Sequence, residues 1–258
     1  MSKIEHVIKS IYFLEEHCRQ KLWINQLHPL TKLLISISYI YIVVSFPKYA
    51  LFPLLTMCCY PLITITLARI SLKVILRQTR VLIVLVCMVG ILNPLFDYQI
   101  LVKIGPFSIT SGILSMVTLM LKGIFSVFAS YLLIATTSME EICSSLKCFH
   151  LPDSFISILL LSYRYFIMFL SELNQMSEAY RLRAVNQRGL HIKAWGSFVG
   201  HFLLRSLDRA NEIFESMILR GFHGNLSVTP IDKPSLLNLL YAIIWLIIFL
   251  IVRLILCH

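Results

Sequence analysis

Two arginine–glycine pairs are the residues of this sequence whose type and spacing could do chemistry. They stand in the segments Gln187-Arg188-Gly189-Leu190 and Leu219-Arg220-Gly221-Phe222. Each pair closes a predicted helix, where glycine suits the left-handed residue after the last turn and the helix dipole favours a cation. A guanidinium held at a rigid helix end can bind a carboxylate of another protein through two parallel hydrogen bonds. Because the pattern occurs twice, we predict a partner with two equivalent docking surfaces.

Two long helices must position these pairs, and we expect them over 153–187 and 193–220. The second carries an apolar row at spacings of three and four residues, formed by Leu203, Leu207, Ala210, Phe214 and Met217. A row of this kind buries one helix face against a partner helix or the membrane surface, so we predict a packing role for it. The opposite faces of the two helices mix charges of both signs.

The composition of the chain is that of a membrane protein. Of its 258 residues, 58% are apolar and 14% charged, and the mean hydropathy is +0.81, whereas soluble domains carry about 25% charged residues. Long apolar runs with almost no charged residues predict spans over 30–46, 49–68, 81–96, 112–136 and 235–252. The expected fold is therefore an all-α polytopic membrane protein of about five transmembrane helices, with the two long helices as a cytoplasmic segment.

Charge placement gives the predicted orientation. The excess of +10 gathers in loops, above all at Arg69, Lys73, Arg77 and Arg80, as the positive-inside rule produces, so it requires no nucleic-acid partner. With residues 1–28 amphipathic and the N-terminus cytoplasmic, 138–233 lie inside and the C-terminus outside. The predicted organisation is an N-terminal segment with four spans (1–136), a cytoplasmic coupling region (137–233) and a final span (234–258).

Three smaller features refine this organisation. Alternating residues around Gly105-Pro106 predict a hairpin over 100–110. Ser138 followed by Glu141 matches a capping box that opens a short helix. Residues 155–170 are apolar but hold Arg164 at their centre, which is costly inside a bilayer. We interpret them as skimming the membrane, with a crossing as the alternative.

The residues resemble a known family, the transmembrane T components of energy-coupling factor (ECF) transporters, and in particular the CbiQ branch that takes up cobalt. The stretch from Arg205 to Gly224 is similar to the family's second signature helix. Other motifs follow the family order: Pro29-Leu30-Thr31-Lys32-Leu33, Thr136-Thr137, Leu151-Pro152 and Tyr163-Arg164-Tyr165. The family triplet is usually Ala-Arg-Gly, and here alanine is replaced by Gln187 and Leu219 while arginine and glycine are kept.

The resemblance implies a coupling role. Two cytoplasmic ABC ATPase subunits would dock on Arg188, Gly189, Arg220 and Gly221, and a separate substrate-binding membrane subunit would carry the cargo. The chain would hold no cofactor and no metal of its own, because its partners bind the ATP. Its location would be the cell membrane. Cobalt is the implied cargo, with nickel or a vitamin as the alternatives.

The remaining chemistry argues against an enzyme. The chain lacks the G-x-x-x-x-G-K-[ST] loop of an ATPase, and no histidine pair has the spacing of a zinc hydrolase. Two hypotheses from other classes stay open. One is a lipid-modifying membrane enzyme that holds a phosphate headgroup at Tyr163 and Arg164. The other is a membrane scaffold whose basic helices bind anionic lipid.

Overall fold

The computed structural model describes residues 3–19, 22–47, 51–92, 100–104, 107–149, 151–183, 192–222, 224 and 236–256. The chain divides into two compact units. We call one the span unit, formed by His17–Ser138 and Asp232–His258, and the other the helix-pair unit, formed by Met1–Glu16 and Met139–Ile231.

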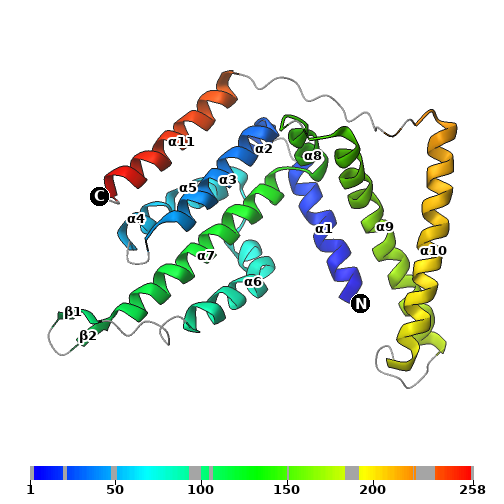
Figure 1. The fold of residues 1–258 in the computed structure, drawn as a ribbon, viewed down its shortest axis with the longest axis horizontal. Helices are drawn as coiled ribbons and strands as arrows, with labels where there is room; N and C mark the ends of the chain where they lie inside the picture. Colours follow the sequence, from blue (N-terminus) through cyan, green and yellow to red (C-terminus); the bar gives the residue numbers. More distant parts are fainter. Residues whose placement is uncertain are drawn as a thin grey trace. The chain divides into compact units, whose positions relative to one another are not determined.

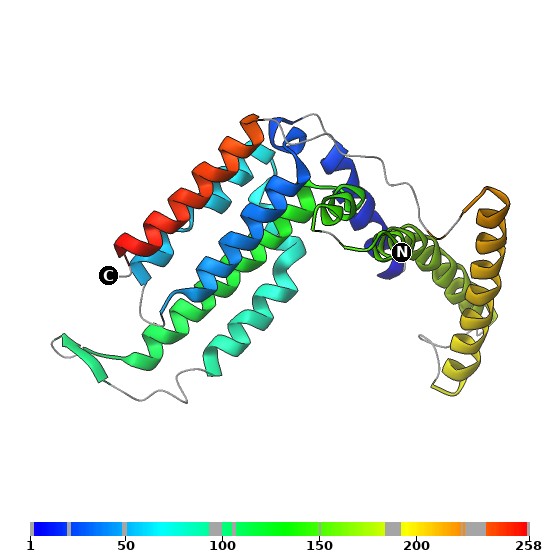
Figure 2. The same cartoon turned by 45° about the horizontal axis from the view of Figure 1, so that its top comes forward.

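The span unit is built around one long helix, α7. Helices α3, α4, α5 and α6 pack against α7, and α11 packs against α3 and α4 (Figure 1). Figure 2 shows α6, α7, α3 and α11 side by side. Their bounds are α2 Trp23–Gln26, α3 Pro29–Ser45, α4 Leu51–Thr56, α5 Cys59–Ala68, α6 Leu72–Leu92, α7 Ser111–Thr136 and α11 Leu236–Leu256.

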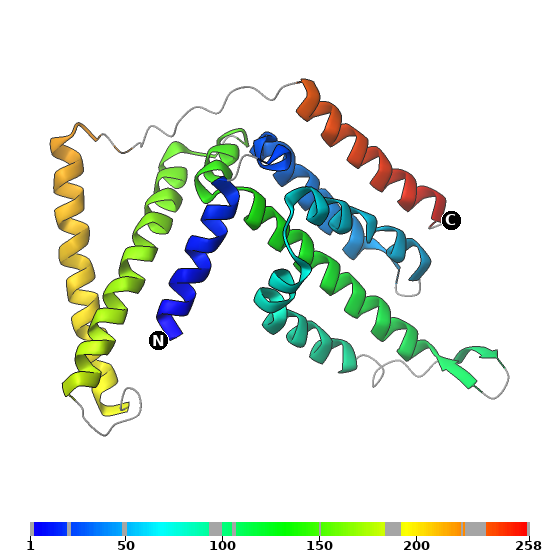
Figure 3. The same ribbon diagram turned by 180° about the vertical axis from the view of Figure 1, so that it is seen from behind.

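The structure confirms an all-α polytopic membrane protein. Among the described residues, five helical segments are long and apolar enough to cross a bilayer: Leu51–Ala68, Leu72–Ile91, Gly112–Thr136, Asp153–Arg183 and Leu236–Leu254. The predicted first span forms the shorter apolar helix α3 of 17 residues. The predicted hairpin is also confirmed, since β1 (Ile100–Ile104) pairs antiparallel with β2 (Phe107–Thr110) before α7 (Figure 3).

Two predicted spans have different bounds in the structure. The third was expected to begin at Val81, but α6 begins at Leu72. Most of the expected basic loop is thus part of α6. The helix starts earlier because Ile75 and Thr79, one turn apart, are buried and extend the buried face of α6 toward its N-terminus. The second span is interrupted: α4 ends at Thr56 and α5 begins at Cys59.

The interruption between α4 and α5 has a local cause. Pro61 has no backbone N–H, so it cannot donate to the carbonyl of Met57 four residues earlier. The Tyr39 hydroxyl donates to this carbonyl at 3.0 Å. The Tyr39 ring is also part of the aromatic core. Its centroid lies 4.6 Å from that of Tyr60 and 5.4 Å from that of Phe249. The aromatic cluster therefore closes over the break in the helix.

Two lysines connect α3 and α7 at opposite ends. Lys32, only 6% exposed, donates from Nζ to the carbonyls of Thr136 at 2.8 Å and Asn25 at 3.2 Å. Lys122 of α7 donates from Nζ to the carbonyl of Val44 at 3.2 Å and to that of Phe46. Each helix thus supplies a cation to the C-terminal carbonyls at the end of the other, where the helix dipole is negative.

The contact between α6 and α7 depends on two glycines. A Cβ added at Gly123 would lie 2.4 Å from Cγ1 of Val86, and one added at Gly90 would lie 2.6 Å from Cγ of Met120. The absence of these side chains lets the two backbones approach closely. The Tyr131 hydroxyl of α7 also donates to Oε1 of Gln78 on α6.

The helix-pair unit contains α8 (Met139–Lys147), α9 (Asp153–Arg183), α10 (Ile192–Leu219) and most of α1 (Lys3–Arg19). Helix α8 begins directly after Ser138, where the capping box predicted a helix start. An ion pair of 3.1 Å between Lys147 Nζ and Asp153 Oδ1 joins α8 to α9. The Tyr163 hydroxyl donates to Oε1 of Glu15 at 2.7 Å, which attaches α1 to α9. Helices α9 and α10 follow the two long helices predicted from the sequence.

Candidate docking site at the end of α10

The end of α10 is built by a left-handed glycine. Gly221 has φ +81°, which confirms the predicted left-handed residue after the helix. The Phe222 amide donates to the carbonyl of Met217 at 3.0 Å, and the Gly221 amide donates to that of Ile218 at 2.9 Å. This pair of bonds defines a Schellman motif, and it satisfies carbonyls that would otherwise have no donor at the helix end.

The motif presents Arg220 to solvent. The Arg220 side chain is exposed, and it leaves the helix at the residue directly before the left-handed turn. A Cβ at Gly221 would meet no atom within 4 Å. Glycine is therefore required by its backbone conformation and not by crowding. The other predicted pair, Arg188 and Gly189, lies outside the described residues.

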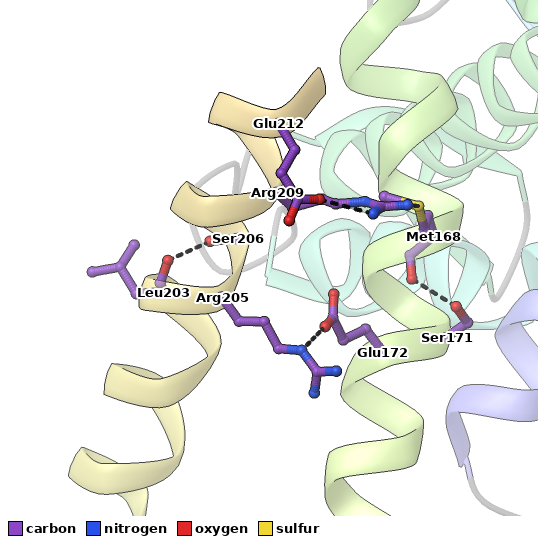
Figure 4. Close-up of polar contacts among 8 residues, drawn as sticks. All are labelled: Met168, Ser171, Glu172, Leu203, Arg205, Ser206, Arg209 and Glu212. Carbon is purple, nitrogen blue, oxygen red and sulfur yellow. Dashed lines mark hydrogen bonds and ion pairs between the residues drawn. The ribbon is translucent and has the colours of Figure 1, made fainter. Parts of the chain in front are cut away.

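Polar and aromatic contacts hold α10 against α9. Arg205 Nε lies 2.6 Å from Oε1 of Glu172, and the rings of Phe169 and Phe202 meet edge to face at 6.0 Å. Figure 4 shows the arginine reaching from α10 to the carboxylate on α9. One turn further along α10, Arg209 Nη1 pairs with Glu212 Oε2 at 3.1 Å. The four charged residues, but not the two phenylalanines, border a polar groove of about 460 Å³ between the two helices.

The pairing of Glu172 with Arg205 was not predicted from the sequence. The charges of both helices were expected on the faces away from the apolar row. The signal that could have found the pair is the presence of opposite charges on two consecutive antiparallel helices. The pairing turns part of the charged face of α10 toward α9.

The apolar row predicted on α10 is exposed in its own unit. Leu203 is 56% exposed, Leu207 53% and Phe214 54%. Ala210 is also exposed, and Met217 is half-buried. The row therefore forms an apolar face that runs along α10 toward the Arg220–Gly221 end. Its packing role stays a prediction, and within the described part of the helix-pair unit no other helix covers it.

The arrangement suits binding of another macromolecule. A rigid helix ends in an exposed guanidinium, and an uncovered apolar face leads to it. In the described part of the chain, no three His, Cys, Asp or Glu side chains come together as metal ligands would. Fold and site together define a multi-pass helical membrane protein with two long consecutive helices, α9 and α10.

The comparison with protein families gives the class a name. Residues 20–230 match the family described as CbiQ, cobalt transport protein. This match covers most of the chain, and the chain belongs to that family. Its members are components of transporters and not enzymes. Helix α1 precedes the matched residues.

The chain is also similar to individual proteins, one of which carries the family's name. The chain is 24% identical over 237 residues to the uncharacterized protein MJ1571 of Methanocaldococcus jannaschii, covering 86% of this chain and 80% of the relative. It is 28% identical over 153 residues to the cobalt transport protein CbiQ of Rhodobacter capsulatus, covering 56% of this chain and 62% of the relative. It is also 28% identical over 145 residues to the chloroplastic protein ABCI12 of Arabidopsis thaliana, covering 51% and 37%.

Proposed function

We propose that this chain is the transmembrane coupling subunit of an ECF-type importer. Two cytoplasmic ABC ATPase subunits dock on the helix ends at Arg188-Gly189 and Arg220-Gly221. The long helices α9 and α10 transmit the movement of the ATPase pair to a substrate-binding membrane subunit. The N-terminus and residues 137–233 face the cytoplasm in this proposal.

The observation that carries the proposal is the form of the end of α10. A Schellman motif fixes Arg220 at the tip of a helix of 28 residues. The planar fork of a guanidinium is pre-organised, so little freedom is lost per hydrogen bond when it binds a carboxylate. A helix of that length rises about 42 Å, so a displacement at its tip is carried far along its axis. Cobalt is the proposed cargo, on the strength of the family and of the relative named as a cobalt transport protein.

Charge reversal at both helix ends tests the docking role. In the double variant Arg188→Glu and Arg220→Glu, each docking surface meets a repelling charge in place of an attracting one. We expect the co-purified ATPase yield to fall by about tenfold or more, since removing one partner of a buried charge pair costs about 2–5 kcal/mol. The matched control is Arg181→Glu and Arg183→Glu, at two exposed arginines near the end of α9. Wild-type yield with the first variant would contradict the proposal.

Substitution of Gly221 tests the geometry of the cap. Valine is strained at φ +81°, whereas asparagine tolerates the left-handed region. We therefore expect Gly221→Val to weaken ATPase co-purification and Gly221→Asn to retain most of it. If both variants bind like wild type, the Schellman motif has no part in docking.

A further inference from the structure

The first turns of α6 carry an exposed basic face. Lys73, Arg77 and Arg80 follow one another at spacings of four and three residues, which places them on one side of the helix. All three are exposed, as is Arg69 at the end of α5. The opposite side of α6, which includes Ile75, Thr79 and Gly90, is buried. The basic face therefore points away from the core of the span unit.

No carboxylate of the same unit is available to these cations among the described residues. The span unit contains two acidic residues in its sequence, Asp97 and Asp232, and both lie outside the described residues. The three ion pairs found in the described part of the chain all lie in the helix-pair unit. The basic face thus differs from the charges of α9 and α10, which include close Arg–Glu pairs.

The length of α6 sets the depth of the cations. The uncharged part of the helix, from Val81 to Leu92, rises only about 18 Å at ~1.5 Å per residue. A bilayer has a hydrocarbon core of about 30 Å. If α6 crosses the core, the turns that hold Arg77 and Arg80 lie at the level of the lipid headgroups or deeper, toward the hydrocarbon. A cation at that depth is stabilised by an anion placed there.

The same face continues as an apolar stripe. Beyond Arg80, the exposed side chains in line with the basic face are Val84 (61%), Met88 (69%) and Ile91 (60%). A surface with cations at one end and exposed apolar side chains over the following turns matches a phospholipid, whose anionic headgroup is followed by acyl chains.

The backbone conformation of Arg69 is a separate observation that favours a cation-rich site at the start of α6. It has φ +52°, the left-handed conformation, and among the described residues it is the one non-glycine residue with positive φ. Its amide donates to the carbonyl of Thr66 at 3.3 Å, and the Ile70 amide donates to that of Ile65 at 3.4 Å. This is the cap that α10 builds with Gly221. An arginine where glycine would be less strained places one more cation directly before α6.

We propose that Arg69, Lys73, Arg77 and Arg80 form a binding site for an anionic phospholipid, with the phosphate on the basic face and an acyl chain along Val84, Met88 and Ile91. The site is separate from the helix ends proposed to dock the ATPases. It would fix the depth of α6 in the bilayer.

Native mass spectrometry of the full chain tests the site. The detergent-purified protein is given equal amounts of phosphatidylglycerol and phosphatidylcholine, and the retained lipids are counted. We expect wild type to prefer phosphatidylglycerol by about tenfold, and the triple variant Lys73→Gln, Arg77→Gln and Arg80→Gln to lose most of this preference. The matched control, Lys147→Gln with Arg181→Gln and Arg183→Gln, removes the same charge from exposed positions of the helix-pair unit and should retain it.

Any of three results of this lipid competition would overturn the proposal. Wild type could retain both lipids equally, the triple variant could keep the preference, or the triple and control variants could lose it to the same extent, which would indicate bulk charge. If the triple variant fails to fold, the salt dependence of the lipid preference can be measured on wild type alone. A headgroup held by exposed cations should lose its preference as salt rises from about 0.05 to 0.5 M, and a preference that ignores salt contradicts the site.

Discussion

Helices α3 and α10 differ in whether their apolar residues are buried. In α3 of the span unit, Tyr39 and Val43 are fully buried among aromatic rings from α5 and α11. In α10 of the helix-pair unit, Leu203, Leu207 and Phe214 are largely exposed although their spacing is equally regular. Regular apolar spacing shows that a face exists, but it does not say whether the chain itself covers that face.

The two units also differ in how they accommodate charge. Lys32 and Lys122 of the span unit donate to backbone carbonyls at helix ends. In the helix-pair unit, Arg205 and Arg209 pair with carboxylate side chains at the surface. The first kind of contact stabilises the unit that contains it. The second kind contributes little to stability, which leaves α9 and α10 suited to change their contacts when a partner binds.

The largest effect is expected where a buried lysine of the span unit is removed. Lys32→Met leaves the carbonyls of Thr136 and Asn25 without this donor. We expect a loss of about 2 kcal/mol, measured as a fall in the thermal unfolding midpoint in detergent of about 5 °C. Lys147→Met, which breaks an exposed ion pair of the helix-pair unit, is the control and should change the midpoint little. Equal midpoints for the two variants would remove the contrast in how the units use charge.

A glycine from each unit gives the next test. Gly123→Ala brings a Cβ to 2.4 Å from Val86 Cγ1, so the Val86 side chain or the two helices must shift, at a cost of about 1–2 kcal/mol. Gly196 of α10 has no atom within 4 Å of the added Cβ, and Gly196→Ala should stabilise the helix by about 0.5–1 kcal/mol. Chemical denaturation of both variants measures the difference. A shift of the same sign in both would contradict the close packing assigned to the span unit.

The ion pair between α9 and α10 should have a smaller effect. A double-mutant cycle with Glu172→Gln and Arg205→Gln is expected to give a coupling free energy of about 0.5 kcal/mol, because Arg205 is largely exposed. A cycle on Arg209 and Glu212, which pair within α10, provides the reference. A coupling of several kcal/mol would indicate that α9 and α10 form a rigid pair without any partner.

The smallest effect on stability is expected on the exposed row of α10. Leu203→Gln with Leu207→Gln should change the unfolding free energy by less than about 0.5 kcal/mol, yet it should lower the yield of co-purified partner subunits if a partner covers the row. Leu182→Gln, at an exposed leucine of α9, is the control for both measurements. A loss of stability as large as that of a core substitution would show that the chain buries this row itself.

Several features could be predicted from local sequence alone. The glycine at 221 predicted a left-handed cap, because the preference of glycine for positive φ is a property of the residue. The alternation around Gly105-Pro106 predicted the hairpin, and the end of the run at Thr136 predicted the end of α7. The family resemblance also rested on local motifs. The match of residues 20–230 to the CbiQ family confirms that resemblance.

Other features depend on contacts between residues far apart in the chain, and the tertiary structure alone decided them. The start of α6 at Leu72 follows from burial of Ile75 and Thr79, which the nearby basic residues Lys73, Arg77 and Arg80 concealed. The reciprocal lysine contacts of α3 and α7 join residues more than 70 positions apart. The exposure of the apolar row on α10 is likewise a property of what packs beside it. Sequence period determines which residues share a face, and only the packing of whole helices determines whether that face is covered.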